Sequence, residues 1–205
     1  MQDLIVRDVR LLGGKPAGRE VLEVDDKTPI DWPIAWARQR ADAYGGDACL
    51  KILAHGLEQR LPVVATKTYR SGIVTQAPIF SQGGAGIYFC TENIRLDTLG
   101  RFALLRGKLK GIDLMGCGAA YITPGFEGTD GDGNLLCHRL AQITGTYVRA
   151  STATQFYNAG VPLWAAIDFG VWEGTVITYA PNGSVYKVES GASAPTSCPI
   201  RPAIP

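Results

Sequence analysis

The sequence predicts an α/β domain with a mostly parallel central sheet and a β-hairpin near its C-terminus. Short apolar runs of strand type alternate with helical patterns, which favours strand–helix–strand units with right-handed crossovers. Two of these apolar runs end in a His or a Cys beside a Gly, as expected where parallel strands reach the edge of a sheet. Near the C-terminus, two strand patterns flank Pro181-Asn182-Gly183, a strong hairpin turn.

The composition is that of an ordinary globular protein with one core. The chain has 205 residues, of which 46% are hydrophobic and 19% charged, and its net charge is +1. This balance favours neither nucleic acid nor a membrane surface as a partner. No basic stretch followed by an apolar one marks the N-terminus. We therefore expect a cytoplasmic chain or one exported without a signal peptide.

The first half of the chain contains the strand–helix–strand pattern. Leu4-Ile5-Val6 indicates a short edge strand or an ordered arm, and residues 20–24 alternate as a strand does. Asp31 is a good N-cap for a helix over 32–44. The strand that follows ends at His55.

The segment after His55 interrupts this pattern. Residues 63–69 and 73–75 indicate short β pieces, which we interpret as a hairpin or flap over the edge of the sheet. The pattern then resumes with further expected elements: a helix over 94–106, a strand over 111–115, a helix over 134–144 and a strand over 146–150. We assign residues 1–190 to one domain and 191–205 to a Pro-rich tail, extended or disordered.

Cysteine usage argues against a disulfide scaffold and against a zinc site. The five cysteines are odd in number and widely spaced, at positions 49, 90, 117, 137 and 198. Cys49 and Cys90 lie in apolar runs and are expected to be small buried residues. Only Cys117 lies in a turn at a strand end.

The two glycine-flanked strand ends predict a site. Because neighbouring parallel strands end at the same edge of a sheet, His55 and Cys117 are expected to meet there. An imidazole can activate a thiol as a nucleophile. The backbone near Gly56, Gly116 and Gly118 is then expected to stabilise an oxyanion. The alternative is that both residues merely end buried strands.

The other candidates are weaker. His138 is the second of only two histidines and is expected on the outer, solvated face of its helix. The run Asp130-Gly131-Asp132-Gly133-Asn134 begins like a calcium-binding loop but lacks the later Gly and Glu of an EF-hand. We expect no metal and no cofactor.

The order of these motifs resembles that of the caspase-like cysteine peptidases, such as caspases, gingipains and clostripain. It is most similar to a caspase-like domain of unknown function found in large bacterial surface proteins. The resemblance extends over about residues 20–180, and its most specific pieces are L-A-x-x-T-G and V-x-A-S. The matching pieces are residues 52–56, 92–94, 112–117, 140–145 and 148–151.

The resemblance implies a three-layer α/β sandwich with a His55–Cys117 dyad. It implies a cysteine endopeptidase or a self-processing domain, a hydrolase acting on a peptide or protein through an acyl-thioester. The alternative function is not enzymatic: a catalytically inactive binding module with the same fold. Reactivity of Cys117 toward an alkylating agent separates these two functions.

Overall fold

The computed structural model describes residues 1–18, 20–68, 74–157, 165–195 and 197–198. Its centre is a seven-stranded sheet in the order β2-β1-β3-β6-β7-β8-β9. The first five of these strands are parallel, and β8 and β9 are antiparallel. The strands are β1 (Gln2–Asp8), β2 (Glu20–Val24), β3 (Ala48–Leu53), β6 (Gly111–Met115), β7 (Tyr147–Ser151), β8 (Thr175–Tyr179) and β9 (Val185–Ser190). The expected α/β class, the mostly parallel sheet and the C-terminal hairpin are confirmed.

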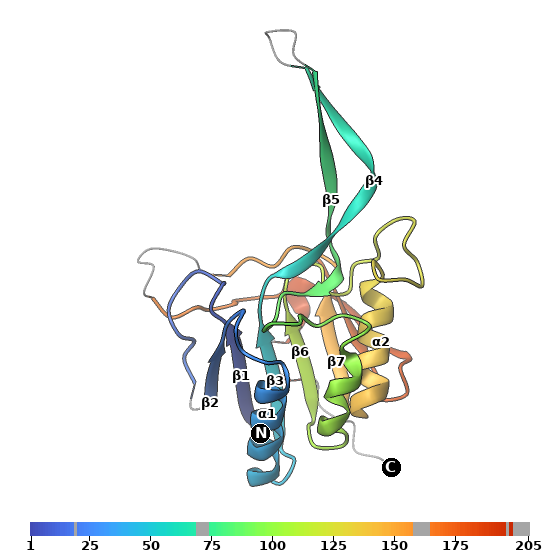
Figure 1. Cartoon of the computed structure of the whole chain (residues 1–205). Helices are drawn as coiled ribbons and strands as arrows, with labels where there is room; N and C mark the ends of the chain where they lie inside the picture. The colour runs from blue at the N-terminus through green and yellow to red at the C-terminus, as the bar shows by residue number, and fades with distance from the viewer. Residues whose placement is uncertain (19, 69–73, 158–164, 196, 199–205) are drawn as a thin grey trace.

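The helices lie over one face of this sheet (Figure 1). They are α1 (Asp31–Ala43), the 3₁₀ helix η1 (Leu99–Leu105) and α2 (Gly133–Thr144). Their buried residues join alternate strand residues, such as Leu50 and Ile52 of β3, in the larger hydrophobic core. The two-residue repeat of a strand explains why every second residue of β3 and β6 enters this core.

Extended chain covers the opposite face of the sheet. Ile167, Phe169, Trp172 and Ala194 pack there against residues of β1, β3 and β6, including Met115. The sheet is thus covered on both faces, which is compatible with a three-layer sandwich. In the described ranges, the layer opposite the helices has no α-helix.

Two expectations at the start of the chain are wrong. Strand β1 lies between β2 and β3, so it is an interior strand, and β2 occupies the edge. Asp31 does not cap α1; Ile30 holds the N-cap position, and its N–H is bound by the Glu92 carboxylate at 3.0 Å. The Asp31 side chain instead forms an ion pair with Arg101.

The helix expected over 94–106 is shorter in the structure than its sequence pattern predicts. Asn93 has a left-handed backbone with φ of 63°, and Ile94 forms a β-bridge with Ile87. The chain therefore turns before it becomes helical, and only Leu99–Leu105 forms η1. In contrast, α2 matches its expected range because Asp132 caps its first turn and Gly145 ends it in the left-handed conformation.

The β pieces expected after His55 form a single long ribbon. Strands β4 (Gly56–Thr68) and β5 (Val74–Ile87) pair antiparallel with several register shifts. The β4–β5 ribbon rises from the carboxyl end of β3 and projects away from the sheet (Figure 1). Its base therefore lies beside the expected site.

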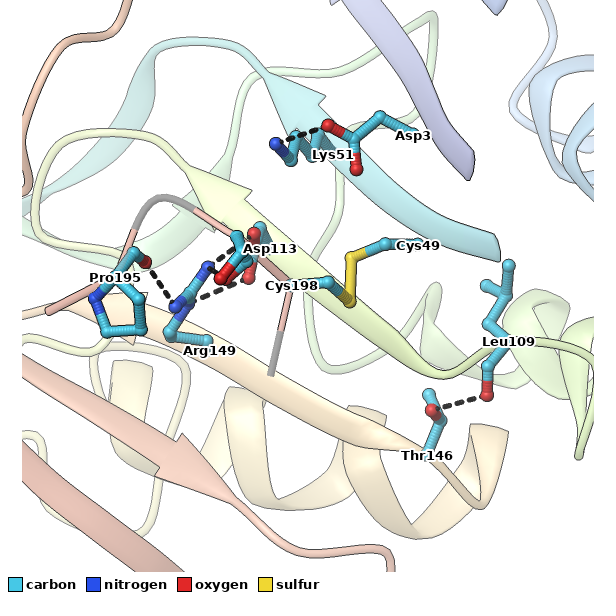
Figure 2. Close-up of a disulfide and its surroundings, with 10 residues drawn as sticks. Asp3, Cys49, Lys51, Leu109, Asp113, Thr146, Arg149, Pro195 and Cys198 are labelled. Atoms are coloured by element: carbon cyan, nitrogen blue, oxygen red, sulfur yellow. Dashed lines mark hydrogen bonds and ion pairs between the residues drawn. A yellow bond between two sulfur atoms is a disulfide. The ribbon is translucent and has the colours of Figure 1, made fainter. Parts of the chain in front are cut away.

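The C-terminal tail is attached to the sheet, and one cysteine expectation is wrong. Cys49 is not a free buried thiol, because it forms a disulfide with Cys198, 149 positions later (Figure 2). Residues 191–193 form a short 3₁₀ helix, and Ala194 and Cys198 are buried. The described part of the tail is therefore anchored to the sheet rather than disordered.

A buried ion pair lies beside this disulfide. The Arg149 guanidinium of β7 donates to both oxygens of Asp113 in β6, at 2.9 and 2.7 Å, and both side chains are 1% exposed. The C-terminal tail adds two hydrogen bonds to this ion pair. The carbonyls of Pro195 and Ser197 accept them from the Arg149 guanidinium at 2.6 and 2.8 Å. Figure 2 shows this pair next to the disulfide. The Trp172 ring packs on the guanidinium, with the ring centroid 5.2 Å from Arg149 Cζ.

Removing the disulfide should destabilise the fold. We expect Cys198→Ser to lower the free energy of unfolding by about 2–4 kcal/mol, because the crosslink closes a long loop in the unfolded chain. Urea denaturation under non-reducing conditions measures this loss. As the control, a reductant should destabilise the wild type to the same extent and leave Cys198→Ser unchanged. A variant as stable as the oxidised wild type would contradict the expectation.

Candidate functional site

His55 and Cys117 lie at the same edge of the sheet. Strands β3 and β6 are parallel neighbours, with Leu53 opposite Met115. His55 and Cys117 each come two residues after these partners. We call this edge, formed by the carboxyl ends of β1, β3, β6 and β7, the rim. The expectation that the imidazole and the thiol share one rim agrees with this register.

Both side chains also belong to the face opposite the helices. The His55 ring lies 6.5 Å from the Tyr157 ring, which stacks on Phe169 of the smaller core. The Cys117 thiol donates to the carbonyl of Gln155, on the same segment as Tyr157. The segment after β7 therefore packs over both proposed catalytic residues.

Glycine is required where the two strand ends approach each other. A side chain at Gly56 would overlap the carbonyl oxygen of Cys117. One at Gly116 would lie 2.9 Å from the Ala54 carbonyl oxygen. Gly118 has a φ of +54°, which favours glycine, and it packs against Gln82 in the base of the ribbon. These glycines bring the backbones after β3 and β6 into contact.

The three glycines do not contribute equally to an oxyanion site. The N–H of Gly118 donates to the carbonyl of Ala153 at 2.8 Å, so that donor is already used. In this structure the Gly118 N–H is therefore not free to bind an oxyanion. Gly56 and Gly116 remain the candidates beside Cys117.

The thiol and the imidazole have separate hydrogen-bond partners in this structure. Cys117 Sγ lies 3.7 Å from the Gln155 carbonyl oxygen, and His55 Nε2 lies 3.3 Å from the Arg10 carbonyl oxygen. When Nε2 carries the proton, it donates to Arg10 and leaves Nδ1 as the basic nitrogen. Catalytic hydrogen bonds commonly tighten only in the substrate complex. The arrangement therefore fits a resting thiol and base at one rim.

Gln155 and Tyr157 also lie at the site, although the sequence did not predict them there. The Gln155 side chain is 3% exposed and binds the backbone N–H and carbonyl of Glu173, at 3.0 and 3.2 Å. This holds the Gln155 carbonyl near the thiol. Burial, and then the negative charge of a Cys117 thiolate, raise the pKa of Tyr157. No sequence motif marks these two residues, because they lie in an irregular segment between strands.

Cys117 differs from the other four cysteines in exposure and bonding. Cys49 and Cys198 are joined in the disulfide, and Cys90 and Cys137 are buried. Burial, reinforced by the charge of Asp8, raises the pKa of Cys90 to about 12, and burial also raises the pKa of Cys137. Cys117 is the one free thiol that is partly exposed. Since alkylation requires an accessible thiolate, Cys117 is the most accessible of the three free thiols.

Alkylation at pH 8 should therefore be selective. We expect iodoacetamide to modify Cys117 first, with Cys90 and Cys137 unmodified in the folded protein. With a pKa of about 12, only about one Cys90 in 10⁴ is a thiolate at that pH. Peptide mass mapping over time measures the rates, and unfolding the protein in urea serves as the control that exposes all free thiols. Labelling of Cys90 or Cys137 as fast as Cys117 would refute this selectivity.

His138 lies away from the rim thiol. It is half-buried on α2, and its ring lies 5.0 Å from that of Tyr179 in β8. The expectation that it faces solvent is therefore wrong in part, because one side of the ring packs on the sheet. Strand β8 lies two strands from β6, which carries Cys117 at its end. Of the two histidines, only His55 follows a strand paired with β6.

The described residues contain neither a metal-ligand cluster nor a membrane-spanning helix. These ranges hold no group of three or more His, Cys, Asp or Glu side chains placed to share a metal ion. None of their helices has the length and apolar character of a membrane-spanning segment.

No protein-family model, curated protein or solved structure matches the chain.

Proposed function

We propose that the chain is a caspase-like cysteine peptidase, acting as an endopeptidase or a self-processing domain with Cys117 as nucleophile and His55 as base. The observation that carries this proposal is their placement: the one partly exposed free thiol and an imidazole follow neighbouring parallel strands at one rim. Ligands and reacting groups collect at this edge in open α/β sheets. The motif resemblance supports the same pair of residues.

The chemistry follows from the two side chains. His55 takes the thiol proton, and the Cys117 sulfur attacks the carbonyl carbon of a peptide bond, forming a C–S bond. The oxygen becomes an oxyanion that backbone N–H groups near Gly56 and Gly116 stabilise. The tetrahedral intermediate collapses as the C–N bond breaks, and the imidazolium returns its proton to the leaving amine. Water then attacks the acyl-thioester, releasing the acid and restoring the thiol.

A peptide library tests this activity. We expect the wild-type protein to cleave a subset of peptides, and Cys117→Ala to cleave none. Mass spectrometry before and after incubation identifies the cut positions. To test self-processing, the intact mass of the protein itself is followed in the same experiment. Cleavage that persists in Cys117→Ala would show that another residue, or a contaminant, does the chemistry.

One observation favours a second function, an inactive binding module with the same fold. The thiol is bound by the Gln155 carbonyl and the imidazole by the Arg10 carbonyl, so each has a partner other than the dyad. In such a module the rim holds a peptide without cleaving it. Binding of library peptides without covalent modification of Cys117 would favour this function over the peptidase.

A further inference from the structure

The Cys49–Cys198 disulfide joins the C-terminal tail to an interior strand of the sheet. Cys49 lies in β3, between β1 and β6, and is 0% exposed, while Cys198 is 1% exposed. Cys198 nevertheless lines a cavity of about 480 Å³ between the tail and strands β7, β8 and β9, together with Arg149 and Tyr186. A small dithiol can therefore reach the disulfide from the Cys198 side.

The tail also contacts the segment that precedes β8. The N–H of Gly191 donates to the Gly174 carbonyl at 2.7 Å, and a side chain at Gly191 would overlap the carbonyl oxygen of Trp172. Arg149 provides a second connection, because its guanidinium binds two carbonyls of the tail and also packs on the Trp172 ring. The tail therefore supports residues 172–174 through two separate sets of contacts.

Residues 172–174 in turn position the carbonyl that binds the Cys117 thiol. The backbone of Glu173 forms two hydrogen bonds with the Gln155 side chain, and the Gln155 carbonyl accepts from Cys117 Sγ at 3.7 Å. A carbonyl oxygen accepts from a thiol but repels a thiolate, and the thiolate is the form that reacts. As long as Gln155 is held in place, its carbonyl therefore opposes the reaction of Cys117.

We propose that the Cys49–Cys198 disulfide is a redox switch for the Cys117 thiol, opened by a reducing dithiol. One thiolate of the reductant forms an S–S bond with Cys198 as the Cys49–Cys198 bond breaks, and Cys49 takes a proton. The second thiol of the reductant then displaces Cys198, which takes the second proton, and the reductant leaves as its own disulfide.

Opening the disulfide acts on Cys117 through the tail. Without the crosslink the tail leaves the sheet, residues 172–174 lose its support, and the Gln155 carbonyl releases the Cys117 thiol. The switch concerns the reactivity of the thiol itself, so it operates whether the rim cleaves peptides or binds them.

Iodoacetamide labelling with peptide mapping tests the switch. The oxidised wild type is compared with the wild type reduced by dithiothreitol and freed of the reductant under anaerobic conditions. In the reduced protein we expect Cys198 to be labelled faster than Cys49, because Cys198 leaves the sheet with the tail. Cys117 should be labelled about 5-fold faster or more than in the oxidised protein, the lower end of the usual coupling between two sites.

Two variants serve as comparisons. Cys198→Ser cannot form the crosslink, so it should show the faster labelling of Cys117 without any reductant. Cys90→Ala removes a buried free thiol outside the tail and should keep both the wild-type rate and its response to reduction. Reoxidation of the reduced wild type should restore slow labelling of Cys117.

Three results would overturn the proposal. If Cys198 is labelled as slowly as Cys49 in the reduced protein, the tail stays on the sheet without the crosslink. If Cys90 and Cys137 become labelled together with Cys198, the disulfide holds the whole fold and not the tail alone. If Cys198 becomes accessible while the Cys117 rate is unchanged or lower, the tail moves without freeing the rim thiol.

Discussion

Replacing His55 with Ala should slow acylation of Cys117 by about 10²-fold or more, the usual contribution of a positioned general base. The imidazole follows β3 and the thiol follows β6, and these strands are paired in parallel register. Without the imidazole, the thiol loses the base that the proposed mechanism assigns to it. The rate of inactivation by a peptide-based thiol-reactive inhibitor measures the loss, with the fold checked by circular dichroism.

His138→Ala is the matched control for this variant. His138 packs on Tyr179 of β8, two strands from β6, so its removal should leave the rate close to that of the wild type. A large loss in His138→Ala together with an unaffected His55→Ala would reverse the assignment of the base.

Replacing Arg149 with Met should lower the free energy of unfolding by about 3–5 kcal/mol, because it leaves the Asp113 carboxylate buried without its partner. The carbonyls of Pro195 and Ser197 would also lose their donor. Urea denaturation of the oxidised protein measures the change. The disulfide should still form, since Cys49 and Cys198 are unchanged.

Arg101→Met provides the comparison for Arg149→Met. Arg101 pairs with Asp31 at the surface, where their side chains are 42% and 66% exposed, so its loss should cost less than about 1 kcal/mol. Equal losses in the two variants would mean that burial of the Arg149–Asp113 pair has little effect on stability.

The parallel pairing of the strands before His55 and Cys117 could be predicted because the sequence marks the end of each strand clearly. Apolar runs ending in His55-Gly56 and in Gly116-Cys117-Gly118 mark strand ends, and intervening helical patterns favour parallel pairing. The helical spacing after Asn134 also predicts α2 well; in the structure Asp132 caps its first turn and Gly145 ends it.

Other features depend on contacts between distant segments, which no local pattern encodes. The pairing of Cys49 with Cys198 requires the tail to return to β3, and spacing alone cannot reveal it. The short η1 follows from the left-handed turn at Asn93, which overrides the helical spacing of the residues after it. Gln155 approaches Cys117 because its side chain binds Glu173, 18 positions later.

Trapping an acyl-enzyme tests whether Cys117 is the nucleophile of a peptidase. The protein is mixed with a peptide ester, quenched in acid after short intervals, and analysed by intact mass and peptide mapping. We expect a mass gain equal to the acyl group, located on Cys117, released by neutral hydroxylamine and absent in Cys117→Ala. A folded wild-type protein that gains no acyl group from esters of the peptides it binds, or that gains it on a residue other than Cys117, would contradict the claim.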